Sequence, residues 1–233
     1  MSSETDLSRN SPTAVPALRA GDRLSRAEFE RRYEAMPQVK KAALIGGVVY
    51  LPSPVSTENP GAPHAPLVTW LGVYQSKTPG VQVADNATVR LDWDNEPQPD
   101  AFLRILSSHG GQARDEDGFV AGGPEWVGEI AASSASYDLH DKKEAYRRNN
   151  VREYLVWRVE EGALDWFVLR GGRYEPLQAD ADGWLKSEVF PGLWLDAAAL
   201  LKRDIGRVLE VLQAGLESEG HAEFVRRLER EAT

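Results

Sequence analysis

Hydrophobic residues recur along the chain with two different periods, and these periods separate predicted helices from predicted strands. Apolar residues at helical spacing, or charged segments free of Gly and Pro, predict helices over about 26–36, 64–74, 138–149 and from 204 onward. Runs rich in β-branched and aromatic residues predict strands within 42–51, 82–86, 87–93, 100–106, 125–132, 152–159, 163–170 and 173–178. Strands outnumber helices, so we expect an α/β fold built on a mixed sheet.

Local signals mark where some of these elements begin and turn. Ser25 is followed three residues later by Glu28, which is the capping-box signal of a helix start. Gly46-Gly47 interrupts the apolar run 42–51, and glycine tolerates the positive φ that a tight hairpin requires. We therefore expect a helix that starts at Ser25 and a hairpin that turns at the two glycines.

The two ends of the chain differ from its centre. Residues 1–22 are rich in Ser, Thr, Asn and Pro without a hydrophobic period, which predicts a disordered leader. We expect one domain over 23–201, followed by C-terminal helices over 202–233. The apolar stripe of these helices packs either on the domain or on a second copy of the chain, so a homodimer is one expectation.

Composition excludes several classes of protein. The chain has no cysteine, which excludes disulfides and thiolate metal sites and favours the cytoplasm. No apolar run approaches the roughly 20 residues of a membrane-spanning helix, so we expect no membrane partner. The net charge of -9 argues against a large basic surface for nucleic acid. An acidic site that binds divalent cations is compatible with this charge, because the bound ions reverse its local sign.

Two carboxylates and a lysine-bearing helix are the candidates for chemistry. Glu129 interrupts an apolar strand, where an ionised carboxylate is costly unless it is paired or coordinated. The alternative to a functional role is a purely structural one, in which Glu129 lies at a sheet edge and faces solvent or pairs with an arginine. Asp100 follows Pro99 at the start of a strand, where a turn or cap is the commoner role. Lys142 and Lys143 lie on the next helix, and a solvated charge is their ordinary role.

The order of these segments carries a resemblance to a known family. The segments PQPDA (97–101) and EWVGEIAASSASYDLHDKKEAYRRNNVREYLVW (125–157) resemble the bacterial restriction-endonuclease branch of the PD-(D/E)XK nuclease superfamily. The resemblance covers about residues 25–200. It implies a restriction-endonuclease-like mixed sheet flanked by helices, with a C-terminal helical extension. It also implies a metal-dependent endonuclease that hydrolyses phosphodiester bonds in DNA.

The resemblance assigns roles to individual residues. It implies that Asp100 and Glu129 bind Mg²⁺ or Mn²⁺ and that Lys142 supplies a cation at the reacting phosphate. It suggests accessory residues as well, which are His64, Tyr146 and Lys143, the last as the fallback for Lys142. For His64, at the start of a predicted helix, a packing role is the alternative.

The chain also departs from the pattern of that superfamily. Ala131 stands where the commonest pattern has a lysine two residues after the glutamate. Relatives often read Tyr-Glu-Leu-Ile-(Asp/Glu)-Gly near the N-terminus, but this chain has Ala43 and Gly46 at the two acidic positions. A hard cation is bound by oxygen ligands, so each lost carboxylate weakens the site. The alternative function is therefore a catalytically degenerate member of the fold that serves as a binding or assembly module.

Overall fold

A computed structural model describes residues 14–51, 61–131 and 138–232 of the chain. Most of the predicted leader, 1–22, lies outside these residues. None of the described helices combines the length and the apolar character that a membrane-spanning segment requires.

A six-stranded mixed sheet forms the centre of the molecule, with the strand order β11-β10-β9-β8-β5-β3. Strands β8 and β9 run parallel, and every other neighbouring pair in this sheet is antiparallel. The strands of this sheet are β3 (Val81–Asp85), β5 (Ala101–Ile105), β8 (Trp126–Ala131), β9 (Glu153–Arg158), β10 (Ala163–Arg170) and β11 (Arg173–Pro176).

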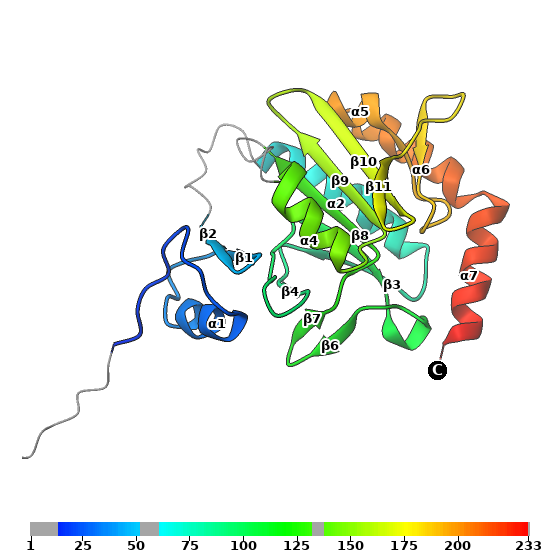
Figure 1. Cartoon of the computed structure of the whole chain (residues 1–233). Helices are drawn as coiled ribbons and strands as arrows, with labels where there is room; N and C mark the ends of the chain where they lie inside the picture. Colours follow the sequence, from blue (N-terminus) through cyan, green and yellow to red (C-terminus); the bar gives the residue numbers. More distant parts are fainter. Residues whose placement is uncertain (1–13, 52–60, 132–137, 233) are drawn as a thin grey trace, which may run out of the picture.

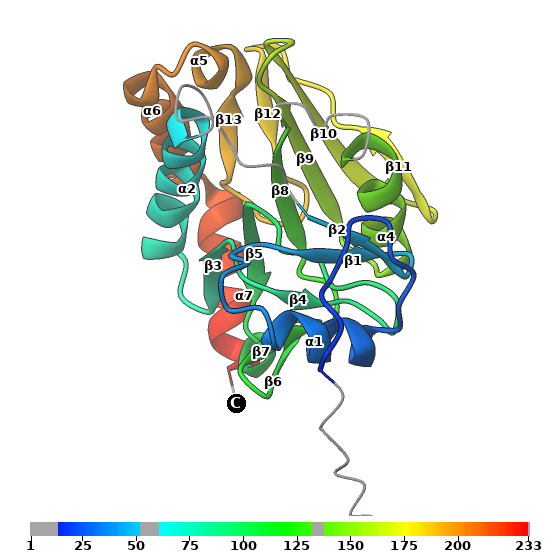
Figure 2. The same cartoon turned by 90° about the vertical axis from the view of Figure 1, so that its left-hand side faces the viewer.

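Helices cover both faces of this sheet, and the layers are seen best in Figure 2. One face packs against four helices, which are α2 (Gly61–Ser76), α5 (Ala197–Leu201), α6 (Ile205–Leu216) and α7 (Glu219–Glu231). The opposite face carries a π-helical turn (Asp138–Lys142) that continues into α4 (Lys143–Arg148). Because α6 and α7 contribute to the core of the sheet, they cover their own domain. A homodimer and a domain boundary at residue 201 stay predictions.

An N-terminal lobe lies beside the sheet (Figure 1). It consists of α1 (Arg26–Glu34) and a hairpin of β1 (Ala43–Ile45) and β2 (Val48–Tyr50) around a small apolar cluster. Two backbone hydrogen bonds between Leu44 and Glu96, of 3.1 and 2.7 Å, join the hairpin to the loop that follows β4. The remaining short elements are β4 (Val89–Arg90), a 3₁₀ turn (Ser107–His109), β6 (Arg114–Glu116), β7 (Phe119–Ala121), β12 (Trp184–Lys186) and β13 (Trp194–Asp196).

The expected mixed sheet flanked by helices, with a C-terminal helical extension, is confirmed. Ser25 caps α1 as expected, because its hydroxyl accepts a hydrogen bond from the Glu28 N–H. The polar segment 107–118, between two of the predicted strands, holds β6, which pairs with β7. All three residues of β6 are exposed, so no hydrophobic alternation marks the strand.

Two other boundaries differ from the expectation. Helix α2 begins at Gly61, three residues before the predicted start at 64. Pro63 lies in the first turn of α2, where the missing N–H has no intrahelical partner to lose. The predicted strand 87–93 shrinks to β4, which pairs with β7 and lies outside the central sheet. The sequence patterns did not predict β12, β13 and α5, because these elements are only three to five residues long.

Three tryptophans form the centre of the core on the α2 face. The ring centroids of Trp70, Trp126 and Trp166 lie 5.9 to 6.1 Å apart in edge-to-face pairs. Gly128 makes room for this arrangement, because a Cβ there would lie 2.6 Å from the Trp126 ring. Trp126 and Gly128 therefore fix one face of β8, and the intervening residues of the strand face α4.

Removal of one member of this cluster should destabilise the whole domain. Trp70 is fully buried, so Trp70→Ala should lower the free energy of unfolding by about 3–5 kcal/mol in urea denaturation. Trp93 is 81% exposed and provides the matched control, since Trp93→Ala should cost less than about 1 kcal/mol. Equal costs for the two variants would contradict this description of the core.

Candidate active site

The strand register brings Asp100 and Glu129 together. In the antiparallel pair of β5 and β8, Ala101 lies opposite Gly128, so the next position places Asp100 opposite Glu129. The Ile130 N–H donates a hydrogen bond of 2.8 Å to Asp100 Oδ2, which fixes the carboxylate at this strand end. Residues that face each other across antiparallel strands have Cβ atoms about 5 Å apart. The two acidic side chains therefore share the face of the sheet that α4 covers.

Glu129 is a buried carboxylate in the interior of the sheet. Only 1% of the residue is exposed, and β8 lies between β9 and β5. The Lys142 Nζ lies 2.8 Å from Glu129 Oε2, and the Tyr146 hydroxyl donates a hydrogen bond of 2.8 Å to Oε1. Glu129 therefore does not lie at a sheet edge facing solvent or paired with an arginine, and this structural alternative is wrong.

The helix after β8 supplies both partners of Glu129. Lys142 and Tyr146 are four residues apart, so they project from the same side of the helix toward the sheet. The Lys142 side chain is only 10% exposed, which excludes the alternative of a solvated helical lysine. Lys143 points elsewhere: its Nζ lies 3.2 Å from the centroid of the Phe167 ring, and burial lowers its pKa. Lys142 therefore reaches Glu129, whereas Lys143 contacts β10.

Asp100 is held by a lysine that the sequence interpretation did not include. The Lys41 Nζ lies 2.8 Å from Asp100 Oδ1. Burial by itself raises the pKa of the Asp100 carboxyl. The charges of Lys41 and Lys142, together with the hydrogen bonds from Lys41 and the Ile130 N–H, outweigh this effect, so the net pKa is lowered. Asp100 is therefore anionic at neutral pH. Lys41 precedes β1 and is 59 residues from Asp100, so no local pattern connects the two.

His64 supports the backbone of Asp100 from helix α2. Its Nε2 lies 3.0 Å from the main-chain oxygen of Asp100 and 3.0 Å from Asp85 Oδ1. Both of these oxygens are acceptors, so the tautomer with its proton on Nε2 donates to them, and Asn86 Nδ2 lies 3.3 Å from the same nitrogen. His64 thus positions the main chain at Asp100, and its accessory role in chemistry stays a prediction.

Because Ala43 and Gly46 carry no carboxylate, the candidate site has two acidic residues, Asp100 and Glu129. Ala43 lies in β1, and Gly46 turns the hairpin with a φ of +57° and donates its N–H to Asn95 Oδ1 at 2.8 Å. Within 14–51, 61–131 and 138–232, no group of three or more His, Asp or Glu side chains could hold a metal ion.

The pair of Asp100 and Glu129 nevertheless fits one magnesium-like cation in donor type and number. Mg²⁺ prefers hard oxygen ligands, and it is commonly bound by one or two carboxylates while waters and substrate phosphates complete its shell. Each carboxylate of this pair already contacts an ammonium group, Lys41 or Lys142. A divalent cation must therefore compete with at least one lysine.

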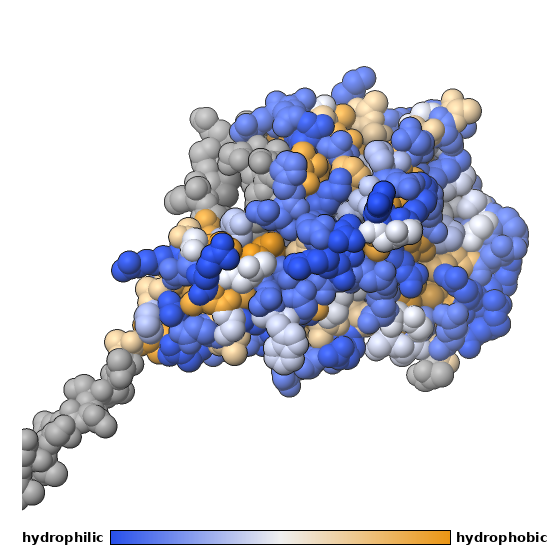
Figure 3. All heavy atoms as spheres, in the orientation of Figure 1, coloured by the Kyte–Doolittle hydropathy of each residue, from blue (hydrophilic) through white to orange (hydrophobic). Residues whose placement is uncertain are grey.

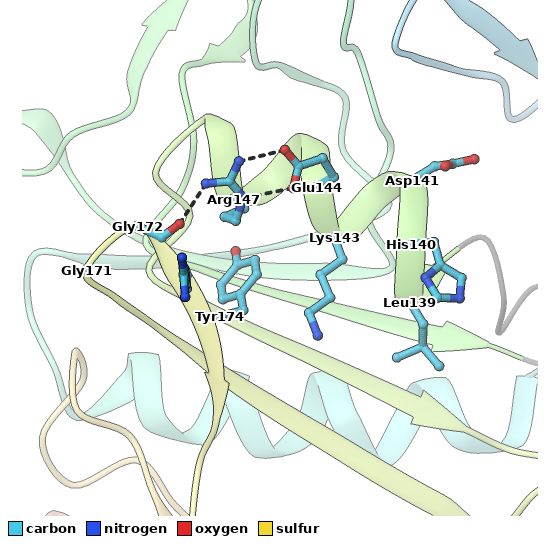
Figure 4. A pocket seen from close by; sticks show the side chains of 10 residues that line it. Leu139, His140, Asp141, Lys143, Glu144, Arg147, Gly171, Gly172 and Tyr174 are labelled. Carbon is cyan, nitrogen blue, oxygen red and sulfur yellow. Dashed lines mark hydrogen bonds and ion pairs between the residues drawn. The ribbon is translucent and has the colours of Figure 1, made fainter.

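A cleft of about 640 Å³ lies between α4 and the turn that joins β10 to β11 (Figure 4). Lys143, Arg147 and Arg173 line it together with the acidic Asp141 and Glu144. Arg147 forms an ion pair with Glu144 and donates a hydrogen bond to the main-chain oxygen of Gly172, as the dashed lines in Figure 4 show. The cleft thus shares its helix with Lys142 and has more basic than acidic side chains.

Comparisons with known proteins agree with this fold. The model of a family named Uma2, with the description "Putative restriction endonuclease", matches residues 26–198. The structure is similar to the crystal structure of "a putative nuclease belonging to DUF820" from Anabaena variabilis ATCC 29413, with a TM-score of 0.53 and 15% identity. That match covers 73% of this chain and 97% of the other, and at this identity it shows the fold alone. No curated protein matches the chain. The resemblance seen in the sequence is confirmed.

The contact between Lys142 and Glu129 can be tested by a double-mutant cycle. Lys142→Met leaves the Glu129 charge buried without its cation and should lower the free energy of unfolding by about 3 kcal/mol. In a Glu129→Gln background the same lysine change should cost much less, because the charge that Lys142 contacts directly is gone. Lys143→Met is the control and should show no such coupling. Additive costs for Lys142→Met and Glu129→Gln would contradict the pairing.

Proposed function

The chain belongs to the Uma2 family, and from this membership together with the geometry of the site we propose that it is a nuclease. We propose more specifically an endonuclease that hydrolyses phosphodiester bonds in DNA and depends on Mg²⁺ or Mn²⁺. The observation that carries the proposal is the pair of facing carboxylates, Asp100 and Glu129, with Lys142 in contact with the second. A cytoplasmic location, which the lack of cysteine favours, is part of the same proposal.

Each residue of the pair and its neighbours has a proposed part in the reaction. Asp100 and Glu129 would hold the divalent cation. When bound, the cation supplies a Lewis acid for the phosphoryl oxygens and makes water a stronger nucleophile. The Lys142 ammonium, held in a nearly water-free position, would neutralise negative charge that develops on the phosphate. Tyr146 keeps the Glu129 carboxylate oriented through its hydrogen bond.

The cleft beside α4 supports DNA as the substrate. Its basic side chains, Lys143, Arg147 and Arg173, are of the kind that contact phosphates of a nucleic-acid backbone. The face that carries α4 is mainly hydrophilic in Figure 3, which suits a polyanionic ligand better than an apolar one. The net charge of -9 opposes non-specific binding elsewhere on the protein, so we expect this cleft to dominate the contact with DNA.

Cleavage of supercoiled plasmid tests the proposed chemistry. The pure protein should nick the plasmid with Mn²⁺ or Mg²⁺ and should not do so in EDTA. Glu129→Gln removes a charge that would hold the cation, so its nicking rate should fall at least about a hundredfold. Glu160→Gln changes an exposed glutamate in the same way and should keep the wild-type rate. Undiminished nicking by Glu129→Gln would refute the assignment of this residue.

Salt dependence of binding tests the role of the cleft. The double change of Arg147 and Arg173 to Gln should weaken binding of a labelled duplex in Ca²⁺ and reduce the slope of log affinity against log salt by about 1–2. Fluorescence anisotropy from low to moderate salt measures both quantities. A matched double change of Arg226 and Arg230 to Gln on α7 alters the net charge equally. If the α7 variant lost as much affinity and slope, binding would follow net charge and not this cleft.

One observation favours a second candidate function. The two lysines balance the charges of Asp100 and Glu129 without a metal ion, and no carboxylate stands at Ala43 or Gly46. A degenerate member of the family that serves as a binding or assembly module would have such a site. That candidate predicts no thermal stabilisation by millimolar Mn²⁺ or Mg²⁺, whereas the nuclease predicts a rise in the melting temperature.

A further inference from the structure

Lys41 occupies the oxygen of Asp100 that a cation would need. The Ile130 N–H already binds Asp100 Oδ2, and the Lys41 Nζ lies 2.8 Å from Oδ1. The same ammonium lies 3.0 Å from Asn86 Oδ1, so two oxygens fix its position. An ammonium and a divalent cation at one carboxylate oxygen repel each other strongly at such distances. Binding of a metal ion at Asp100 therefore requires Lys41 to move.

The lysine that is free to move can be identified from the exposure of the two side chains. Lys41 is 34% exposed along its side chain, whereas Lys142 is 10% exposed and lies under the helix beside Glu129. A surface lysine with a flexible four-carbon side chain can rotate its ammonium group into the solvent at little cost in free energy. Lys142 would have to leave a buried partner that keeps its charge. Lys41 is therefore the lysine that a metal ion would displace.

The lobe that carries Lys41 keeps it within reach of the site. Backbone hydrogen bonds between Leu44 and Glu96 hold β1 against the loop after β4, only a few residues from Asp100. The ammonium is thus tethered at a high local concentration near Asp100, unlike a counter-ion from solution. The segment just before the hairpin brings a positive charge to this site, and Ala43 and Gly46 of the hairpin add no negative one.

We propose that Lys41 is a built-in, displaceable counter-ion that competes with the divalent cation for Asp100 and so weakens metal binding in the absence of substrate. This inference rests on the proposed metal-dependent function. It assigns to Lys41 control of the metal affinity of the site, with Lys142 remaining on Glu129.

Direct binding of Mn²⁺ to the full chain, followed by the electron paramagnetic resonance signal of free Mn²⁺, tests this proposal. Removal of the competitor in Lys41→Met should tighten Mn²⁺ binding by about five- to tenfold. Lys40→Met removes an exposed neighbouring charge that is one residue away and should change the affinity less than about twofold. Lys41→Arg keeps a cation beside Asp100 and should retain the wild-type affinity.

Asp100→Asn separates the two ways in which the test could fail. If Asp100→Asn abolishes Mn²⁺ binding but Lys41→Met binds no tighter than wild type, the role of Lys41 is overturned and the metal site stands. If Asp100→Asn binds Mn²⁺ as well as wild type, the proposed metal site itself is overturned, and the competition with it.

Thermal unfolding gives a second readout that requires no activity. Without metal, Lys41→Met should melt at a lower temperature than wild type, because Asp100 has lost its counter-ion. Saturating Mn²⁺ should raise its melting temperature by more than it raises that of wild type. An equal rise in both proteins, with folding confirmed by circular dichroism, would contradict the proposed competition.

Discussion

Two carboxylates that lie side by side on one covered face of a sheet repel each other, and the arrangement persists only if cations or protons compensate them. In this protein the antiparallel register of β5 and β8 creates the pair of Asp100 and Glu129. The helix after β8 supplies Lys142, and the N-terminal lobe supplies Lys41. Three parts of the chain thus supply the charges that balance one another at this pair. The same requirement makes the pair suited to a divalent cation, which is the basis of the proposed nuclease function.

The sequence predicted those features that depend on local pattern or on one neighbouring element. Glu129 stood out because it interrupts an apolar strand, and the helix that follows was placed within a few residues of its true ends. Lys142 was chosen over Lys143 from the resemblance, and the structure brings Lys142 to Glu129. Lys41 was missed because its contact with Asp100 spans 59 residues, and hydrophobic periodicity contains no information about such long-range ion pairs.

The distribution of charge explains how an acidic protein could act on DNA. The basic residues that matter for the proposal lie on α4 and at the start of β11, where Arg147 and Arg173 line the cleft. Glu129 of the acidic pair contacts the same short helix through the hydroxyl of Tyr146. A metal ion at the pair would add positive charge next to this basic cleft, so the electrostatic field at the site would depend on metal occupancy.

A crystal of the protein soaked in Mn²⁺ and measured near the manganese absorption edge tests the central claim most directly. The account predicts an anomalous peak in contact with both Asp100 and Glu129, with the Lys41 side chain turned away from Asp100 and Lys142 still beside Glu129. A crystal at saturating Mn²⁺ without a peak at this pair, in which Lys41 still contacts Asp100, would contradict it.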